Sequence, residues 1–209
     1  MTEPYTKPMI QHDIVQGIIR GEYLQTGLLS ERQLMEKYGV TKSIVREALV
    51  ELCSENVLRS IPRYGYEIVT LTEGEVRDIL KYRVLVECNS LPAVMERATH
   101  AEIEELAAYT QTLSPSGDQD VWDAWDNNSK FHLQLIALGG NRYCYDQLKR
   151  SLSILKRAYA QFYWDQWRRV RFHFNSEHHL QMTDALLRGD MQTARLVLEE
   201  DICSFGNKL

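Results

Sequence analysis

The sequence has few of the features that mark secreted, membrane-bound or zinc-finger proteins. Its four cysteines among 209 residues have no paired spacing, which argues against a disulfide framework or a zinc finger and predicts buried free thiols. No apolar run approaches the length of a membrane span, and residues 1–8 are polar, unlike a signal peptide. We therefore expect a soluble cytoplasmic protein with no membrane partner.

The chain also lacks an excess of positive charge, since its formal net charge is −5. Residues 1–70 contain 8 Lys and Arg against 9 Asp and Glu, and the remainder contains 16 against 20. Any binding of nucleic acid must therefore depend on the local placement of a few cations, and on dimerisation to double the contacts. The hydrophobic content of 44% is sufficient for the core of one large or two modest domains.

A helix-turn-helix pattern is present between Ser30 and Leu52. Ser30 is a suitable N-cap for a helix that begins at Glu31 and ends near Tyr38, and Gly39 permits the sharp reversal that follows. Thr41 then caps a second helix, whose apolar residues recur at a spacing of three to four and are expected to pack inward. These inward residues are Val40, Val45, Ala48, Leu49 and Leu52.

The opposite face of the second helix carries Lys42 and Arg46, as a recognition helix does when it presents cations to the DNA major groove. Residues 57–69 then form two short apolar runs around a turn that includes Arg63 and Gly65, which predicts a β-hairpin. This order of elements is that of a winged helix, with Arg63 at the tip near a phosphate or the minor groove. The alternative is an ordinary helical hairpin with a solvated charged face.

These residues resemble the GntR-type bacterial transcription regulators. The match spans about Ile10 to Val69 and rests on Ile18-Ile19-Arg20-Gly21, Gly27, Leu29-Ser30-Glu31, Leu34, Tyr38-Gly39-Val40-Thr41, Val45-Arg46-Glu47-Ala48-Leu49 and Gly65. The resemblance implies a homodimer on a short palindromic operator in double-stranded DNA. The expected DNA contacts are Arg32, Thr41, Lys42, Ser43, Arg46, Arg63 and Gly65. Lys42 stands where the family usually has Arg, and lysine forms the planar bidentate pair with guanine less well.

Beyond residue 70 the sequence shows no strand pattern and predicts an all-helical bundle of about six helices. We therefore expect a mainly α protein, with a winged helix-turn-helix DNA-binding domain over 1–70 and an all-helical domain over 71–209. The first helix of the bundle is expected over 73–96, with Pro92 kinking or interrupting it. The others are expected over about 99–113, 118–138, 142–164, 169–188 and 190–205.

Polar side chains lie on otherwise apolar faces of three of these helices. Asn128 and His132 share one such face, His179 lies on a second and Asp201 on a third. The last two helices fold back on each other near residue 190, which places His179 opposite Asp201. Two imidazoles, a carboxylate and an amide oxygen suit a divalent transition metal, with zinc or nickel preferred. A hydrogen-bonded His–Asp pair without metal is the alternative, and His178 is expected to be exposed.

The second half resembles the FCD effector domain of FadR-like GntR regulators. The resemblance rests on Arg83 with Glu87, on Asn128, Phe131-His132, Leu135 and Gly140-Asn141, and on His179, Ala185-Leu186, Gly189-Asp190 and Ala194. In many members an Asp and three His bind a metal that holds an organic acid. The resemblance implies Asn128, His132, His179 and Asp201 as ligands, with Arg83 near the acid's carboxylate. Asn128 stands where Asp is frequent, and Asp201 where the third His is usual.

The leading hypothesis is a ligand-responsive transcription regulator, with a small organic or sugar acid as effector, and not an enzyme. One alternative is a metal-dependent enzyme that uses the two histidines and the aspartate, although no recognisable nucleophile or general-base motif accompanies them. Another is a metal sensor with no organic effector. The aromatic and arginine-rich segment 162–174 is expected to be bundle core with solvated arginines, and a nucleic-acid stacking surface or a membrane-surface segment are its alternatives.

Overall fold

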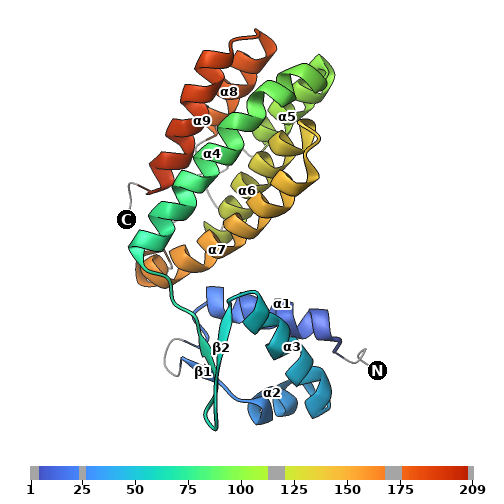
Figure 1. Cartoon of the computed structure of the whole chain (residues 1–209), viewed down its shortest axis with the longest axis vertical. Coiled ribbons are helices and arrows are strands. Elements are labelled where there is room, and N and C mark those ends of the chain that lie inside the picture. The colour runs from blue at the N-terminus through green and yellow to red at the C-terminus, as the bar shows by residue number, and fades with distance from the viewer. Residues whose placement is uncertain (1–4, 24–26, 113–120, 168–175, 207–209) are drawn as a thin grey trace. The chain divides into compact units, whose positions relative to one another are not determined.

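A computed structural model describes residues 5–23, 27–112, 121–167 and 176–206 (Figure 1). Within these ranges the protein is mainly α, with nine helices and one small antiparallel sheet, as the sequence predicts. The chain divides into two compact units, one of Met1–Leu71 with Arg157–Trp164 and the other of Thr72–Lys156 with Asp165–Leu209. No helix in the described ranges is long and apolar enough to cross a membrane.

The first unit contains the expected helix-turn-helix. Its elements are α1 (Lys7–Ile19), β1 (Leu28–Leu29), α2 (Glu31–Tyr38), α3 (Lys42–Ser54), β2 (Leu58–Ile61) and β3 (Gly65–Ile68). The Ser30 hydroxyl accepts a hydrogen bond of 3.2 Å from the Gln33 N–H, and Gly39 ends α2 in the left-handed region at φ 64°. The predicted inward residues of α3 are buried and pack against Ile10 and Ile14 of α1, with Val40 partly buried beside them.

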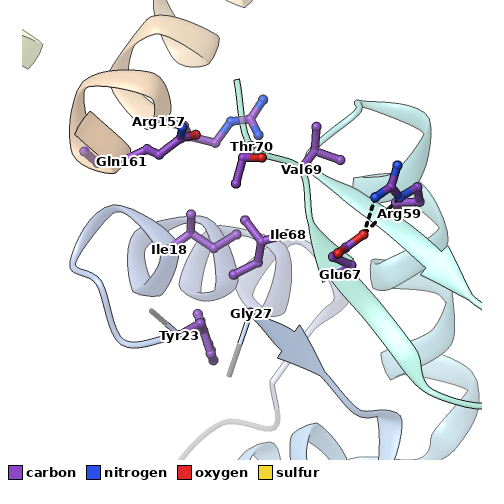
Figure 2. Close-up of a pocket in the computed structure, with 11 residues that line it drawn as sticks. Ile18, Tyr23, Gly27, Arg59, Glu67, Ile68, Val69, Thr70, Arg157 and Gln161 are labelled. Atoms are coloured by element: carbon purple, nitrogen blue, oxygen red, sulfur yellow. Dashed lines mark hydrogen bonds and ion pairs between the residues drawn. The ribbon is translucent and has the colours of Figure 1, made fainter. Parts of the chain in front are cut away.

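The three strands form a sheet in the order β1-β3-β2, in which all neighbours are antiparallel. The β2–β3 hairpin confirms the predicted wing, whereas the two-residue strand β1 was not predicted because it is too short to show alternation. Gly65 has φ 126°, and a Cβ atom there would lie 2.4 Å from the Leu29 carbonyl oxygen of β1. Across the hairpin, Arg59 Nε donates a hydrogen bond of 3.0 Å to Glu67 (Figure 2).

The second unit is a helical bundle. Its elements are α4 (Glu73–Arg97), α5 (His100–Thr112), α6 (Val121–Leu138), α8 (Glu177–Leu187), α9 (Met191–Gly206) and α7 (Arg142–Trp167), of which the stretch Arg157–Trp164 belongs to the first unit. Helix α4 packs against α6 and α9, and α8 packs against α5 and α9. Capping boxes open the first two helices, since the hydroxyls of Thr72 and Thr99 accept hydrogen bonds from the N–H groups of Glu75 and Glu102. These contacts bring α4, α6, α8 and α9 around one interior.

Three of the expectations for this unit need correction. Pro92 does not interrupt α4, since the helix continues to Arg97 and the neighbours Leu91 and Val94 are buried in the core, whereas the expected kink stays a prediction. A single helix over 169–188 is wrong, since α8 begins at Glu177 after the non-helical Ser176. Not all thiols are buried, because Cys203 is exposed, although all four cysteines are free. The expected start of α6 at residue 118 and most of segment 162–174 lie outside the described residues.

Candidate functional site

Three of the proposed metal ligands converge in the interior of the second unit. One ligand atom each from His132 of α6, His179 of α8 and Asp201 of α9 lie within 4.8 Å of one another, and all three residues are buried. Asp201 Oδ2 is 3.1 Å from His132 Nε2 and 3.4 Å from His179 Nε2. The reversal at Gly189, with φ 73°, brings α8 and α9 together and so places His179 opposite Asp201.

The aromatic ring of Phe131 fixes the orientation of both imidazoles. It stacks on the His179 ring at a centroid distance of 3.7 Å and an interplanar angle of 6°, and it meets the His132 ring edge to face. Asn128, the fourth predicted ligand, is buried one turn before His132 on the same face of α6. The geometry therefore presents rigid imidazoles toward a shared polar position.

Glu87 of α4 completes the cluster and has no assigned role in the sequence analysis. Its Oε2 lies 2.6 Å from His132 Nδ1, and its Oε1 accepts a hydrogen bond of 2.7 Å from Arg83 Nε. The side chains of Glu87 and Arg83 are both buried, at 0% and 2% exposure. The i, i+4 spacing of Arg83 and Glu87 was visible in the sequence, but the contact with His132 needs the packing of α4 against α6.

Two buried atoms of this cluster lack hydrogen bonds within the described residues. Arg83 Nη2 has no partner, and His132 Nε2 has none in hydrogen-bond alignment although Asp201 Oδ2 is close. Buried polar groups of native proteins are usually satisfied by protein, water or a bound group. An electron-pair acceptor beside His132 and an anion beside Arg83 would satisfy the two atoms.

The charges of the cluster depend on its burial and on its pairing. Burial opposes ionisation of Asp201, but His132, His178 and His179 outweigh it and hold the pKa of Asp201 well below the usual range. In the same way, Arg83 and His132 outweigh burial and lower the pKa of Glu87. Both acids are therefore carboxylates, and burial lowers the pKa of His179, which keeps it neutral and able to ligate.

His132 behaves differently from His179. Burial lowers its pKa, but the charge of Glu87 and the proximity of Asp201 outweigh burial, so the pKa of His132 is raised. A metal ion at Nε2 would replace a proton there, as expected for an imidazole ligand.

The expected exposure of His178 is wrong. Its side chain is 31% exposed, and its Nδ1 lies 3.5 Å from Asp201 Oδ1. The expected exposure rested on Arg171 and Gln181, which share a helical face with His178 in the sequence pattern. In the structure, α9 packs close enough to α8 to bring Asp201 beside His178. Asp201 thus has histidines against both of its oxygens.

The predicted DNA contacts of the helix-turn-helix lie on exposed parts of α2 and α3. Lys42 and Arg46 are exposed on the first turns of α3, with Lys42 Nζ 3.4 Å from Glu31. Arg32 is 89% exposed and its Nε lies 3.0 Å from Glu36. The cation of each of these ion pairs is exposed to solvent, so the pairs are weak and a phosphate can compete for the cation.

The remaining predicted contacts flank that face. Thr41 is the N-cap of α3, but its side chain makes no capping hydrogen bond among the described residues, and Ser43 Oγ donates to Glu47 at 3.1 Å. In the wing, Arg63 is exposed and adopts φ 72°, which is unusual for a residue with a side chain. Gly65 has a structural explanation in its close approach to Leu29, whatever its role toward DNA.

Comparisons with known proteins agree with both halves of this description. Residues 6–68 match the family described as bacterial regulatory proteins, gntR family, and residues 78–202 match the FCD domain. The uncharacterised regulator YdhC of Bacillus subtilis is 29% identical over 60% of this chain and 57% of its own length. The Nta operon transcriptional regulator of Aminobacter aminovorans is 27% identical over 81% of this chain and 79% of its own length.

The fold is shared with a solved regulator of low sequence identity. McbR/YncC of Escherichia coli is 18% identical, with a TM-score of 0.69 over 100% of this chain and 99% of the other. Both units of this chain therefore have counterparts in one solved protein.

Proposed function

This chain belongs to the GntR family of DNA-binding transcription regulators and carries an FCD domain, and from that premise we propose that it is a repressor or activator controlled by a small acid. In this proposal residues 1–70 bind a short palindromic operator as part of a homodimer. Residues 71–209 bind the effector, an organic or sugar acid, through a divalent transition metal such as zinc or nickel.

The convergence of His132, His179 and Asp201 is the observation that carries the metal proposal. Two imidazoles and one carboxylate are a common ligand set for divalent transition metals, and Asn128 would supply a fourth, neutral oxygen. The Nε2 atom of His132 supports the fit, because it is buried without an aligned hydrogen bond and an ion there would take the place of a proton. When bound, the ion would supply a Lewis acid that polarises and orients a carboxylate ligand.

The charges of the cluster favour an anionic effector. Glu87 pairs with Arg83, so with neutral histidines a divalent ion and Asp201 leave one positive charge in excess in the buried cluster. A buried charge without a counter-ion is costly, so an anion beside Arg83 would be stabilised. The Nη2 atom of Arg83, which has no partner in the described part of the chain, is the donor available to it.

The DNA-binding half of the proposal depends on a small number of exposed cations. In this proposal Lys42 and Arg46 enter the major groove, Arg32 reaches the backbone, and Arg63 at the wing reaches a phosphate or the minor groove; all four side chains are exposed. Because the first 70 residues carry no net positive charge, a monomer would bind weakly and two copies on a palindrome would double the contacts.

Gel-shift titration with upstream DNA tests the DNA-binding half. The wild type should bind a palindromic site, and Arg46→Ala should abolish specific binding while its melting temperature stays unchanged, because Arg46 is exposed. Exposed Arg77→Ala, outside the helix-turn-helix, is the matched control and should bind as the wild type does. Full operator binding by Arg46→Ala would remove Arg46 from the recognition surface.

Elemental analysis of the purified protein and thermal shifts with a panel of organic and sugar acids test the effector half. We expect a divalent metal in the wild type and a stabilising acid whose effect disappears in Arg83→Gln. The metal itself should remain in that variant, because Arg83 is not one of the four proposed ligands. Equal stabilisation of wild type and Arg83→Gln by the acid would remove Arg83 from the effector site.

A further inference from the structure

The carboxylate of Glu87 bridges the two functional groups of the second unit. One oxygen accepts from Arg83 Nε at 2.7 Å, and the other lies 2.6 Å from His132 Nδ1. Glu87 is fully buried, and from α4 it reaches His132 of α6 at the proposed metal site. A buried carboxylate in this position does more than satisfy Arg83, because only one of its oxygens is used for that purpose.

The second oxygen determines which nitrogen of His132 faces the metal cluster. An ionised carboxylate can only accept hydrogen bonds, so His132 Nδ1 must carry the proton that it shares with Glu87 Oε2. In a neutral imidazole the other nitrogen then carries the lone pair. That nitrogen is Nε2, which lies 3.1 Å from Asp201 Oδ2 inside the cluster.

Building on the proposed metal site, we propose that Glu87 is a positioning residue that prepares His132 to bind the metal through Nε2 and holds Arg83 at the same time. Carboxylate–histidine–metal arrangements of this kind orient the ring and raise the basicity of the ligand nitrogen. The residue is therefore shared between the anion-binding arginine and a metal-binding histidine.

The substitution Glu87→Gln tests this role with little change in volume. A glutamine has one accepting oxygen and one donating NH₂ group, so it cannot accept from both Arg83 Nε and His132 Nδ1. If its NH₂ group faces His132, it donates to Nδ1 and leaves the proton on Nε2, where it blocks the metal. If its oxygen faces His132, its NH₂ group faces Arg83 Nε and cannot accept the hydrogen bond from it. His132 Nδ1 then donates to a neutral amide oxygen instead of to a carboxylate.

The measurement is the affinity of the full chain for Zn²⁺ alone, determined by competition with a chromophoric chelator. We expect Glu87→Gln to bind Zn²⁺ about 10-fold to 100-fold more weakly than the wild type. The control Glu96→Gln makes the same change at an exposed position of α4 and should bind as the wild type does. Melting curves without metal report whether each variant is folded.

A second measurement uses only the wild type, so it still tests the inference if Glu87→Gln does not fold. In the ¹⁵N NMR spectrum of Zn²⁺-loaded protein, His132 should show a protonated Nδ1 and a metal-bound Nε2. Coordination through Nδ1 would overturn the inference.

The inference and the proposed metal site fail in different ways. Zn²⁺ binding by wild type and Glu87→Gln with affinities within about twofold would remove Glu87 from the site and leave the metal proposal intact. Absence of Zn²⁺ binding by the wild type would overturn both.

Discussion

Replacement of Asp201 by asparagine isolates the contribution of charge to the proposed metal site. The substitution keeps the size of the side chain and one oxygen, but it removes the negative charge from a group that is 10% exposed. An ion between Asp201 Oδ2 and the two Nε2 atoms, which lie 3.1 and 3.4 Å away, would be close to that charge. A unit charge and a divalent ion about 4 Å apart interact by about 8 kcal/mol at an effective dielectric constant of about 20, and the cost of burying the carboxylate offsets part of this.

The amide dipole of asparagine recovers part of this interaction. We therefore expect a loss of about 2.7 kcal/mol, which is about a hundredfold in the dissociation constant of the metal. Thermal unfolding with metal at about 100 times the wild-type Kd should stabilise the wild type by about 2.7 kcal/mol and Asp201→Asn by about 0.4 kcal/mol. For a chain of this length, these values correspond to melting shifts of about 5–10 °C and about 1–2 °C.

The mirror substitution Asn128→Asp is the matched control. It adds a carboxylate one turn before His132, so the metal-induced melting shift should exceed that of the wild type. Without metal the same variant should be less stable than the wild type, because it crowds carboxylates in a buried site. A metal-induced shift that is identical in wild type, Asp201→Asn and His132→Ala would refute the site.

Three further predictions concern stability. Gly65→Ala should destabilise the protein by about 1–3 kcal/mol in urea unfolding, because the new Cβ would lie 2.4 Å from the Leu29 carbonyl oxygen. The control Gly27→Ala should cost less, because Gly27 also has a positive φ but has open space around the position of the Cβ. Equal losses of stability in the two variants would contradict the close approach at Gly65. Thr72→Ala should cost about 1 kcal/mol by removing the capping box of α4, whereas unchanged stability would show that packing alone sets its start. Hydrogen bonds from Lys37 and Tyr38 lower the pKa of Asp13, so its stabilising effect is present above its ordinary pKa of 3.8 and is lost as the pH falls through the lower folded value. The advantage of wild type over Asp13→Asn in urea unfolding should be below about 1 kcal/mol at neutral pH, since the side chain is 42% exposed, and should shrink under acid; an advantage that grows there would contradict the sign.

Local patterns in the sequence were enough to predict most of the elements and the inward faces of several helices. The cap at Ser30, the reversal at Gly39 and the inward residues of α3 depend on spacings of three or four residues, which a helix converts directly into positions on its surface. The opposition of His179 and Asp201 was also predictable, because a short reversal joins two adjacent helices and leaves little choice of register.

Contacts between elements that are distant in sequence were decided only by the tertiary structure. The sequence does not show that Glu87 meets His132, that His178 lies beside Asp201, or that β1 pairs with β3 above Gly65. Each of these contacts depends on the distance and the angle at which two elements pack. Helical periodicity determines which face of a helix is apolar, but it does not determine which residue of the neighbouring helix lies against that face.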